Sequence, residues 1–277
     1  MSLAFAAWEF LSLPSVRRSL AGLLVAGVSM PVVGVLIVGL DIITVRFAVM
    51  HTALLGTAVG LWIGMDSTVA ALVACVVAAL AVAPSADKPN GVSAPMSYLM
   101  TISAAAALLV LSVSGVNANG AFEVLWGSIL AMRVVDLCLI SVVALSVLVF
   151  AFSQVKSLSL LLFDRETAKC SGVAVTGLTT AALVLVALSV GTSIRVTGAL
   201  LVDSVTILPA LAARNLADST QSMFLWAMGI GVTGNLIGFF VALQLDLPPG
   251  PVLVVVAGLI SACTALASRV SRVPVSH

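Results

Sequence analysis

Long apolar stretches separated by short polar turns dominate the chain. A helix needs about 20 apolar residues to cross the hydrocarbon layer of a bilayer. Nine stretches come close to that length: 19–40, 43–64, 67–84, 97–116, 134–153, 174–191, 194–213, 222–244 and 251–267. They are apolar on every face, whereas the strands of a membrane β-barrel alternate polar and apolar residues. The pattern predicts an all-α, polytopic transmembrane helical bundle of eight or nine spans, the count depending on 194–213, which Pro209 interrupts.

The low content of charged residues supports this fold class. Only 8% of the 277 residues are charged, against about 25% in a soluble domain, so there are too few charges to cover a surface that faces water. A soluble enzyme, a nucleic-acid-binding protein and a disordered chain are excluded. The net charge of +1 indicates no particular partner.

The whole of 1–277 is interpreted as one transmembrane domain. Residues 1–14 carry Trp8, Glu9 and Phe10 and lack a basic start. We therefore expect an N-terminal helix in the membrane interface rather than a signal peptide.

The distribution of basic residues indicates how the chain is oriented in the membrane, because basic residues concentrate in cytoplasmic loops. With the loop 154–173 in the cytoplasm, the C-terminus is cytoplasmic too. The basic residues then inside are Lys88, Lys156, Arg165, Lys169, Arg214, Arg269 and Arg272. Those outside or near the outer side are Arg17, Arg18, Arg133 and Arg195. The bias predicts a multi-pass protein of the plasma membrane.

Small residues mark places where helices approach closely. GxxxG patterns occur at Gly56, Gly60 and Gly64, and again at Gly234 and Gly238. Such patterns allow close packing in lipid, either inside the bundle or at a subunit interface. The four cysteines show no CxxC spacing and are interpreted as small apolar residues.

Motifs for catalysis are missing from the sequence. There is no GxxxxGK[ST] loop for nucleotide phosphates, no apparent Ser-His-Asp or Cys-His set, and only two histidines, His51 and His277. We therefore expect a chain that is no enzyme and binds no cofactor. Transport, channel or scaffold roles remain.

Among the ionisable residues inside predicted spans, three stand out: Arg46 and His51 in 43–64 and Asp203 in 194–213. Such residues are costly in a membrane and usually functional. Imidazole and carboxylate both bind first-row metals, so His51 and Asp203 are candidates to line a metal passage, with Met50 and Cys75 as softer ligands. The alternative is structural: Asp203 pairs with Arg46, and His51 bonds a backbone carbonyl.

The loop at 163–172 predicts a short helix. Asp164 is a suitable N-cap, Glu166 and Lys169 suit the helix dipole, and Gly172 can end the helix in a left-handed conformation. So short a helix is marginal alone in water. It therefore suggests docking against a cytosolic partner, the alternative being a plain surface turn.

Five segments, in order, resemble motifs of one family. They are His51-Thr-Ala-Leu-Leu-Gly56, Leu125-Trp-Gly-Ser-Ile-Leu130, Phe163-Asp-Arg-Glu-Thr-Ala168 with Gly172, Gly198-Ala-Leu-Leu-Val202 with Leu208-Pro-Ala210 and Arg214, and Asp246-Leu-Pro-Pro-Gly-Pro251. Together they resemble the permease subunits of bacterial ABC importers for zinc, manganese and iron.

The resemblance implies a homodimeric permease with ATPase subunits on its cytoplasmic face and a metal-binding receptor outside. The segment 163–172 would be the coupling helix, with Asp164, Glu166, Ala168 and Gly172 matching the motif. A divalent metal would be the transported substrate, moved by alternating access.

The chain also departs from the family pattern. Phe47 stands where relatives carry an acid four residues before the histidine, and Ser128 replaces the acid of a second motif. Conversely, Asp203 stands where relatives have a small or hydroxyl residue, and Arg46 where glycine is common. Either Asp203 substitutes for the lost acid, or the passage no longer handles a bare divalent ion. An Arg46–Asp203 pair would compete with a cation for the carboxylate.

The sequence therefore predicts the membrane-spanning subunit of an ATP-driven importer for manganese, zinc or iron. The alternatives are a permease of the same family that carries a chelated metal or haem, a proton-coupled secondary transporter, and a membrane scaffold without transport activity. Paired broken helices and inverted repeats, typical of secondary transporters, are not evident in the sequence.

Overall fold

A computed structural model describes residues 13–87, 91–114 and 132–271. The expected interfacial helix at 1–14 and the Leu125–Leu130 motif with Ser128 fall essentially outside these residues. Within them, all regular structure is helical. The α-helices are α2 (Pro14–Gly39), α3 (Ile43–Ile63), α4 (Ser67–Val82), α5 (Ser93–Ser114), α7 (Val134–Ser153), α8 (Val155–Phe163), α9 (Arg165–Cys170), α10 (Val175–Thr197), α11 (Ala199–Leu216), α12 (Thr220–Leu245) and α13 (Pro249–Ser271), with a 3-10 turn at Ala83–Asp87.

In the described part of the chain, eight of these helices are long and apolar enough to cross a membrane. The prediction of eight or nine spans and of an all-α bundle is confirmed. Of the nine expected spans, the one whose helix is not among the eight is 194–213, which covers most of α11. Helix α11 has 18 residues, contains Asp203 and Pro209 and carries Arg214 in its last turn.

Local chemistry explains where the helices begin and end. The Asp66 carboxylate accepts hydrogen bonds from the backbone N–H groups of Thr68 and Val69 and so caps α4. Gly64 ends α3 in the left-handed conformation, with φ of 73°. At the start of α2, Pro14 occupies a position where its missing N–H leaves no bond unmade.

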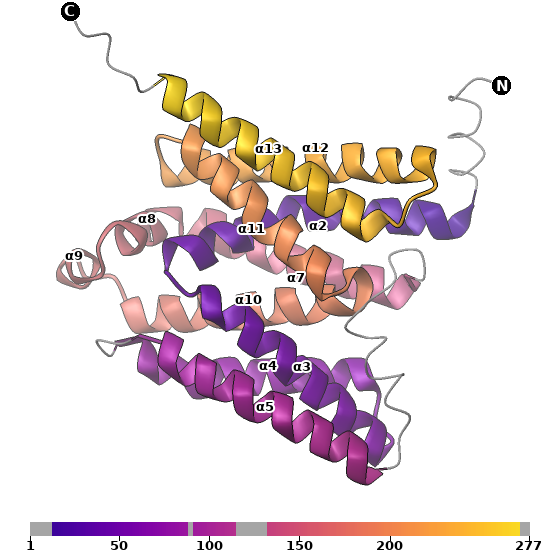
Figure 1. Cartoon of the computed structure of the whole chain (residues 1–277). Coiled ribbons are helices and arrows are strands. Elements are labelled where there is room, and N and C mark those ends of the chain that lie inside the picture. The colour runs from indigo at the N-terminus through magenta and orange to yellow at the C-terminus, as the bar shows by residue number, and fades with distance from the viewer. Residues whose placement is uncertain (1–12, 88–90, 115–131, 272–277) are drawn as a thin grey trace, which may run out of the picture.

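The helices pack into two groups on either side of α10 (Figure 1). The α3 group consists of α3, α4 and α5, which pack on one another. The α11 group consists of α2, α11, α12 and α13. Helix α10 contacts members of both groups, and α7 packs on α2 and α10. The α9 helix lies at one end of the bundle, and the α3–α4 and α12–α13 turns lie at the other.

The GxxxG glycines serve packing inside the chain. Gly56 and Gly60 lie against Ala70 and Ala74 of α4, and Gly238 lies against Leu253 of α13. Gly64 contributes to the left-handed end of α3 rather than to a helix face. Of the two roles considered for these patterns, the contacts show close packing within the bundle.

Two features depart from the expected boundaries. The apolar segment after α7 forms a separate helix, α8, which the sequence did not indicate because Gln154 breaks the helix without Gly or Pro. Helix α10 continues to Thr197, beyond the predicted end at 191, and meets α11 at Gly198, with φ of 79° and ψ of 157°. As a result Asp203 lies in the second turn of α11 instead of deep inside a long span.

Candidate functional site

An ion pair joins the two helix groups. Nη1 of Arg46, near the start of α3, lies 2.8 Å from Oδ1 of Asp203 in α11. The Arg46 side chain is 16% exposed and that of Asp203 is 28% exposed. Because α3 and α11 belong to different groups, the pair connects segments that otherwise pack mainly on other helices.

The Arg46–Asp203 pair is poorly hydrogen-bonded. Oδ1 of Asp203 is within ion-pair distance of Nη1 but lacks a hydrogen-bond partner of good geometry among the described residues, and Nε of Arg46 has none either. Both atoms are buried. Buried polar atoms without partners are costly, so this arrangement leaves bonding capacity unused on both side chains.

Phe47 links the ion pair to His51. The Arg46 guanidinium lies 4.4 Å from the centre of the Phe47 ring, in a cation–π contact. Nδ1 of His51 lies 2.8 Å from the backbone oxygen of Phe47. A carbonyl oxygen only accepts hydrogen bonds, so Nδ1 donates, and in the neutral ring Nε2 carries the free lone pair. Such a backbone bond is the usual orientation of a metal-binding histidine.

The predicted site residues form rows along α3. Met50 follows Arg46 by one helical turn, as His51 follows Phe47, so these half-buried side chains occupy neighbouring positions on the helix surface. The structure pairs Asp203 with Arg46 and His51 with a backbone carbonyl, as the structural alternative expected. No cluster of three or more His, Cys, Asp or Glu occurs among the described residues.

Cys75 lies apart from this region. Its thiol is buried, points toward the backbone oxygen of Val49 at 3.7 Å and lies beside Gly191. Helices α3, α4 and α10 meet around it. The side chain fills a close helix contact, as expected for an apolar cysteine, and adds no ligand to the row on α3.

The short helix α9 forms where the sequence predicted it. The Asp164 carboxylate accepts a hydrogen bond from the backbone N–H of Thr167 at 2.6 Å, and Lys169 pairs with Glu166 at 3.1 Å. Hydrogen bonds from the side chain and backbone of Thr167 lower the pKa of Asp164 below its ordinary value. Gly172 follows with φ of 79°.

Helix α9 presents polar groups outward and one apolar residue inward. Ala168 is fully buried, while the Glu166 side chain is 75% exposed. The preceding Phe163 is 85% exposed at this end of the bundle. A groove of about 770 Å³ lies between α7, α8 and the start of α10 and includes Gly172, which follows α9. Phe163 lines a second groove of about 420 Å³, with residues of α2, α11 and α12. Together these features form a surface available to a second protein.

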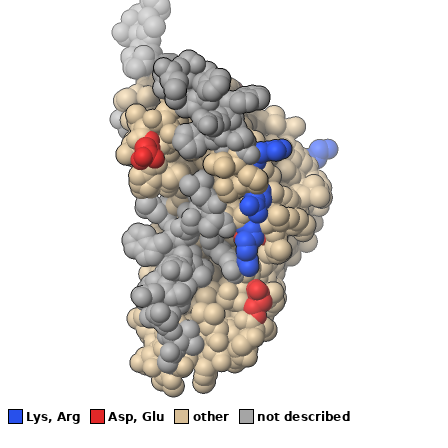
Figure 2. All heavy atoms as spheres, turned by 90° about the vertical axis from the view of Figure 1, so that its right-hand side faces the viewer, with Lys and Arg blue, Asp and Glu red and all other residues tan. Residues whose placement is uncertain are grey.

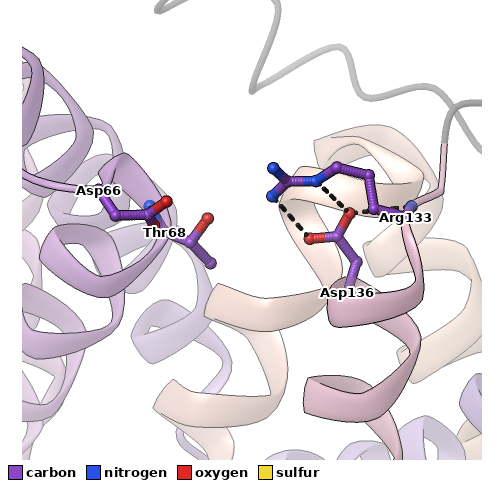
Figure 3. Close-up of polar contacts among 4 residues, drawn as sticks. All are labelled: Asp66, Thr68, Arg133 and Asp136. Carbon is purple, nitrogen blue, oxygen red and sulfur yellow. Dashed lines mark hydrogen bonds and ion pairs between the residues drawn. The ribbon is translucent and has the colours of Figure 1, made fainter.

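The opposite end of the bundle carries charged side chains, with basic groups gathered at one edge (Figure 2). The best-bonded ion pair of the described residues lies there (Figure 3). Arg133 contacts both carboxylate oxygens of Asp136 at 3.2 Å and also donates its backbone N–H. The hydrogen bond and the charge of Asp136 raise the pKa of Arg133, and Asp66 adds to the effect.

Sequence reasoning gave Arg133 a place near the outer side but no role. The signal was its spacing from Asp136, three residues later, at the start of an apolar run, which is the spacing of a capping box. A second residue that went unnoticed is Asn235 in α12. Its Nδ2 donates to the backbone oxygen of Leu23 in α2 at 2.9 Å and holds these helices together.

Four of the five resembling segments lie inside the described residues. His51–Gly56 lies in α3, Phe163–Gly172 includes α9, Gly198–Val202 forms the α10–α11 junction, and Asp246–Pro251 forms the α12–α13 turn.

Comparison with known proteins agrees with this arrangement. The chain is 24% identical over 256 residues to the manganese transport system membrane protein MntC of Halalkalibacterium halodurans, covering 92% of this chain and 87% of that protein. It is 26% identical over 215 residues to the high-affinity zinc uptake system membrane protein ZnuB of Haemophilus influenzae, covering 74% and 79%.

The fold is similar to that of a solved structure, PsaBC from Streptococcus pneumoniae in complex with Fab. The TM-score is 0.80 with 22% sequence identity, and the match covers 95% of each chain. A model of the ABC 3 transport family matches residues 12–267. Because this match extends over nearly the whole chain, the protein belongs to the ABC 3 transport family.

Proposed function

We propose that this protein is the membrane-spanning permease subunit of an ATP-driven importer for a divalent transition metal, manganese or zinc, with iron as a third candidate. The family match over residues 12–267 carries the proposal. The relatives named above are described as manganese and zinc transport proteins, which supports a metal substrate.

The energy source is proposed to be a separate ATPase. The sequence has no phosphate-binding loop of its own, and α9 offers a capped helix beside the exposed Phe163 and a groove. Asp164, Glu166, Ala168 and Gly172 would form the coupling contact. In this proposal ATP binding moves α9, and the helix bundle alternates between outward and inward access.

His51 and Asp203 are proposed to line the passage. The hydrogen bond from Nδ1 to the Phe47 carbonyl leaves Nε2 of His51 free to bind a metal. Asp203 brings a carboxylate that is 28% exposed in the isolated chain. Neither residue alone makes a closed cage, which suits a site that must release its ion.

The assembly proposed is a homodimer of this chain with two ATPases at the α9 end and a metal-binding receptor at the opposite end. The α9 end would face the cytoplasm, since it carries Lys156, Arg165 and Lys169. The C-terminal end of α13 lies toward the same side in Figure 1, so the C-terminus would also be cytoplasmic.

The test is metal uptake by cells that produce the complete transporter in a strain without its own importer. Cellular manganese, zinc and iron are measured for the wild type, Asp203→Asn and His51→Ala. Loss of uptake of one metal in both variants is expected. Wild-type uptake in both would contradict the passage assignment, and wild-type levels in Asp164→Ala would contradict the coupling assignment.

Two inhibitors separate the driving forces. Vanadate, which blocks ABC ATPases, is expected to stop uptake. An ionophore that collapses the proton gradient without depleting ATP is expected to leave uptake unchanged. The opposite result would identify a proton-coupled transporter, and preference for a metal chelate over the free ion would identify the chelate permease.

A further inference from the structure

The chain contains two Arg–Asp pairs of contrasting construction. At the outer end, Arg133 contacts both oxygens of Asp136 and the pair closes a helix cap. Between the helix groups, Nη1 of Arg46 lies 2.8 Å from Oδ1 of Asp203, and buried atoms of both side chains have no hydrogen bond among the described residues. A bidentate pair is the stronger form, so the Arg46–Asp203 pair is easier to separate than the Arg133–Asp136 pair.

Arg46 has a second favourable contact besides the Asp203 carboxylate. Its guanidinium already lies over the Phe47 ring at 4.4 Å. A cation–π contact compensates part of the loss when a guanidinium leaves a carboxylate. The arginine can therefore release Asp203 while its charge remains beside the aromatic ring.

A cation that reaches Asp203 must compete with the charge of Arg46 for the carboxylate. A divalent ion attracts a carboxylate more strongly than a single positive charge at the same distance, whereas a monovalent ion has no such advantage.

We propose that Arg46 is a specificity-determining residue of the passage: a tethered cation that occupies Asp203 at rest and that a transported ion must displace. The inference rests on the proposed metal passage through Asp203. Arg46 weakens the retention of any ion at this carboxylate. It thereby disfavours ions that depend on this carboxylate alone and allows the bound metal to leave.

The test is equilibrium binding of Mn²⁺ to the purified full-length protein in lipid nanodiscs, with Ca²⁺ as a competitor. Ca²⁺ binds carboxylate oxygens and serves as the ion to be excluded. In Arg46→Gln we expect Mn²⁺ to bind about tenfold more tightly than in the wild type, because the competing charge is gone. We also expect Ca²⁺ to compete more effectively. In the double variant Arg46→Gln/Asp203→Asn, both the tighter Mn²⁺ binding and the stronger Ca²⁺ competition should be absent.

Two further variants complete the design. Arg46→Lys keeps the positive charge, so it is expected to fold even if the neutral variant does not. A lysine is held less firmly over Phe47 than a guanidinium, so its Mn²⁺ affinity should lie between those of the wild type and Arg46→Gln. Arg133→Gln breaks the other Arg–Asp pair and should leave Mn²⁺ affinity unchanged.

The outcomes distinguish this inference from the proposed function. Affinity equal to or below that of the wild type in both Arg46→Lys and Arg46→Gln, with Asp203→Asn abolishing binding, would overturn the role of Arg46 and leave the passage intact. Wild-type Mn²⁺ binding in both Asp203→Asn and His51→Ala would overturn the passage itself. An equal gain in Arg133→Gln would show a general charge effect and also refute the role of Arg46.

Discussion

Gly34 in α2 lies directly against the backbone carbonyl of Thr206 in α11. A Cβ atom at position 34 would overlap this carbonyl and touch the Cβ atom of Ala210. We expect Gly34→Ala to destabilise the protein by roughly 1–3 kcal/mol, because backbone atoms of α11 would have to shift. The measurement is thermal unfolding in detergent, followed by size-exclusion chromatography.

Gly229→Ala is the matched control for this contact. A Cβ atom there would meet nothing within 4 Å, so the transition temperature should not fall. If Gly34→Ala and Gly229→Ala have the same transition temperature, the close approach of α2 and α11 is contradicted.

The cap of α9 gives a second prediction. Asp164→Ala removes the acceptor for the Thr167 N–H, so backbone amides of Arg165–Cys170 should exchange hydrogen several-fold faster. Asp164→Asn keeps a side-chain acceptor and should retain most of the protection. Hydrogen–deuterium exchange measured by mass spectrometry on the full-length protein reports both. Equal protection in the wild type and Asp164→Ala would show that the cap does not stabilise α9.

The lowered pKa of Asp164 also fixes the pH range of this cap. Its ordinary value is 3.8, and the folded value lies below that. The contribution of the cap is therefore fully present above pH 3.8 and is lost as the pH falls through the folded pKa. Protection of α9, corrected for intrinsic exchange rates, should be the same at about pH 7 and about pH 5. A decline over that interval would contradict the assignment.

The Arg133–Asp136 pair predicts a structural defect without a transport defect. The Asp136 side chain is 8% exposed and bonded by Arg133 through both oxygens. Asp136→Ala should lower stability by about 1–2 kcal/mol, because it removes an N-terminal cap and a charged hydrogen bond. Mn²⁺ affinity should not change. A shift in affinity with unchanged unfolding temperature would reverse this conclusion.

Gly198 links backbone geometry to the candidate site. Its φ of 79° and ψ of 157° belong to a region that is essentially restricted to glycine and costs other residues about 1–3 kcal/mol. We expect Gly198→Ala to displace the start of α11 and so to weaken Mn²⁺ binding at Asp203. Gly258→Ala is the control, because this glycine has open space around it. Equal Mn²⁺ binding in both variants would contradict the effect.

Local signals in the sequence accounted for the parts of the fold that depend on neighbouring residues. Asp164 and Gly172 predicted both ends of α9, and the apolar run at 134–153 coincides with α7. Boundaries that depend on tertiary packing were less well predicted. Helix α10 packs on α2, α3 and α4 and extends to Thr197, and no local residue indicates this extension.

The candidate site was predictable in its residues, and its pairing was predicted only as one of two alternatives. Ionic side chains within apolar runs identified Arg46, His51 and Asp203. Whether Asp203 joins His51 or pairs with Arg46 depends on how α11 lies against α3, and the break at Gly198 sets the start of α11. A sequence does not encode such a register in any local pattern.

Helix α10 follows α9 after a turn of four residues and is wedged between the two helix groups. Helix α10 therefore begins beside α9 and contacts both helix groups along its length. A displacement of α9 would therefore reach both helix groups through one helix, and the Arg46–Asp203 pair lies between the groups that it would move.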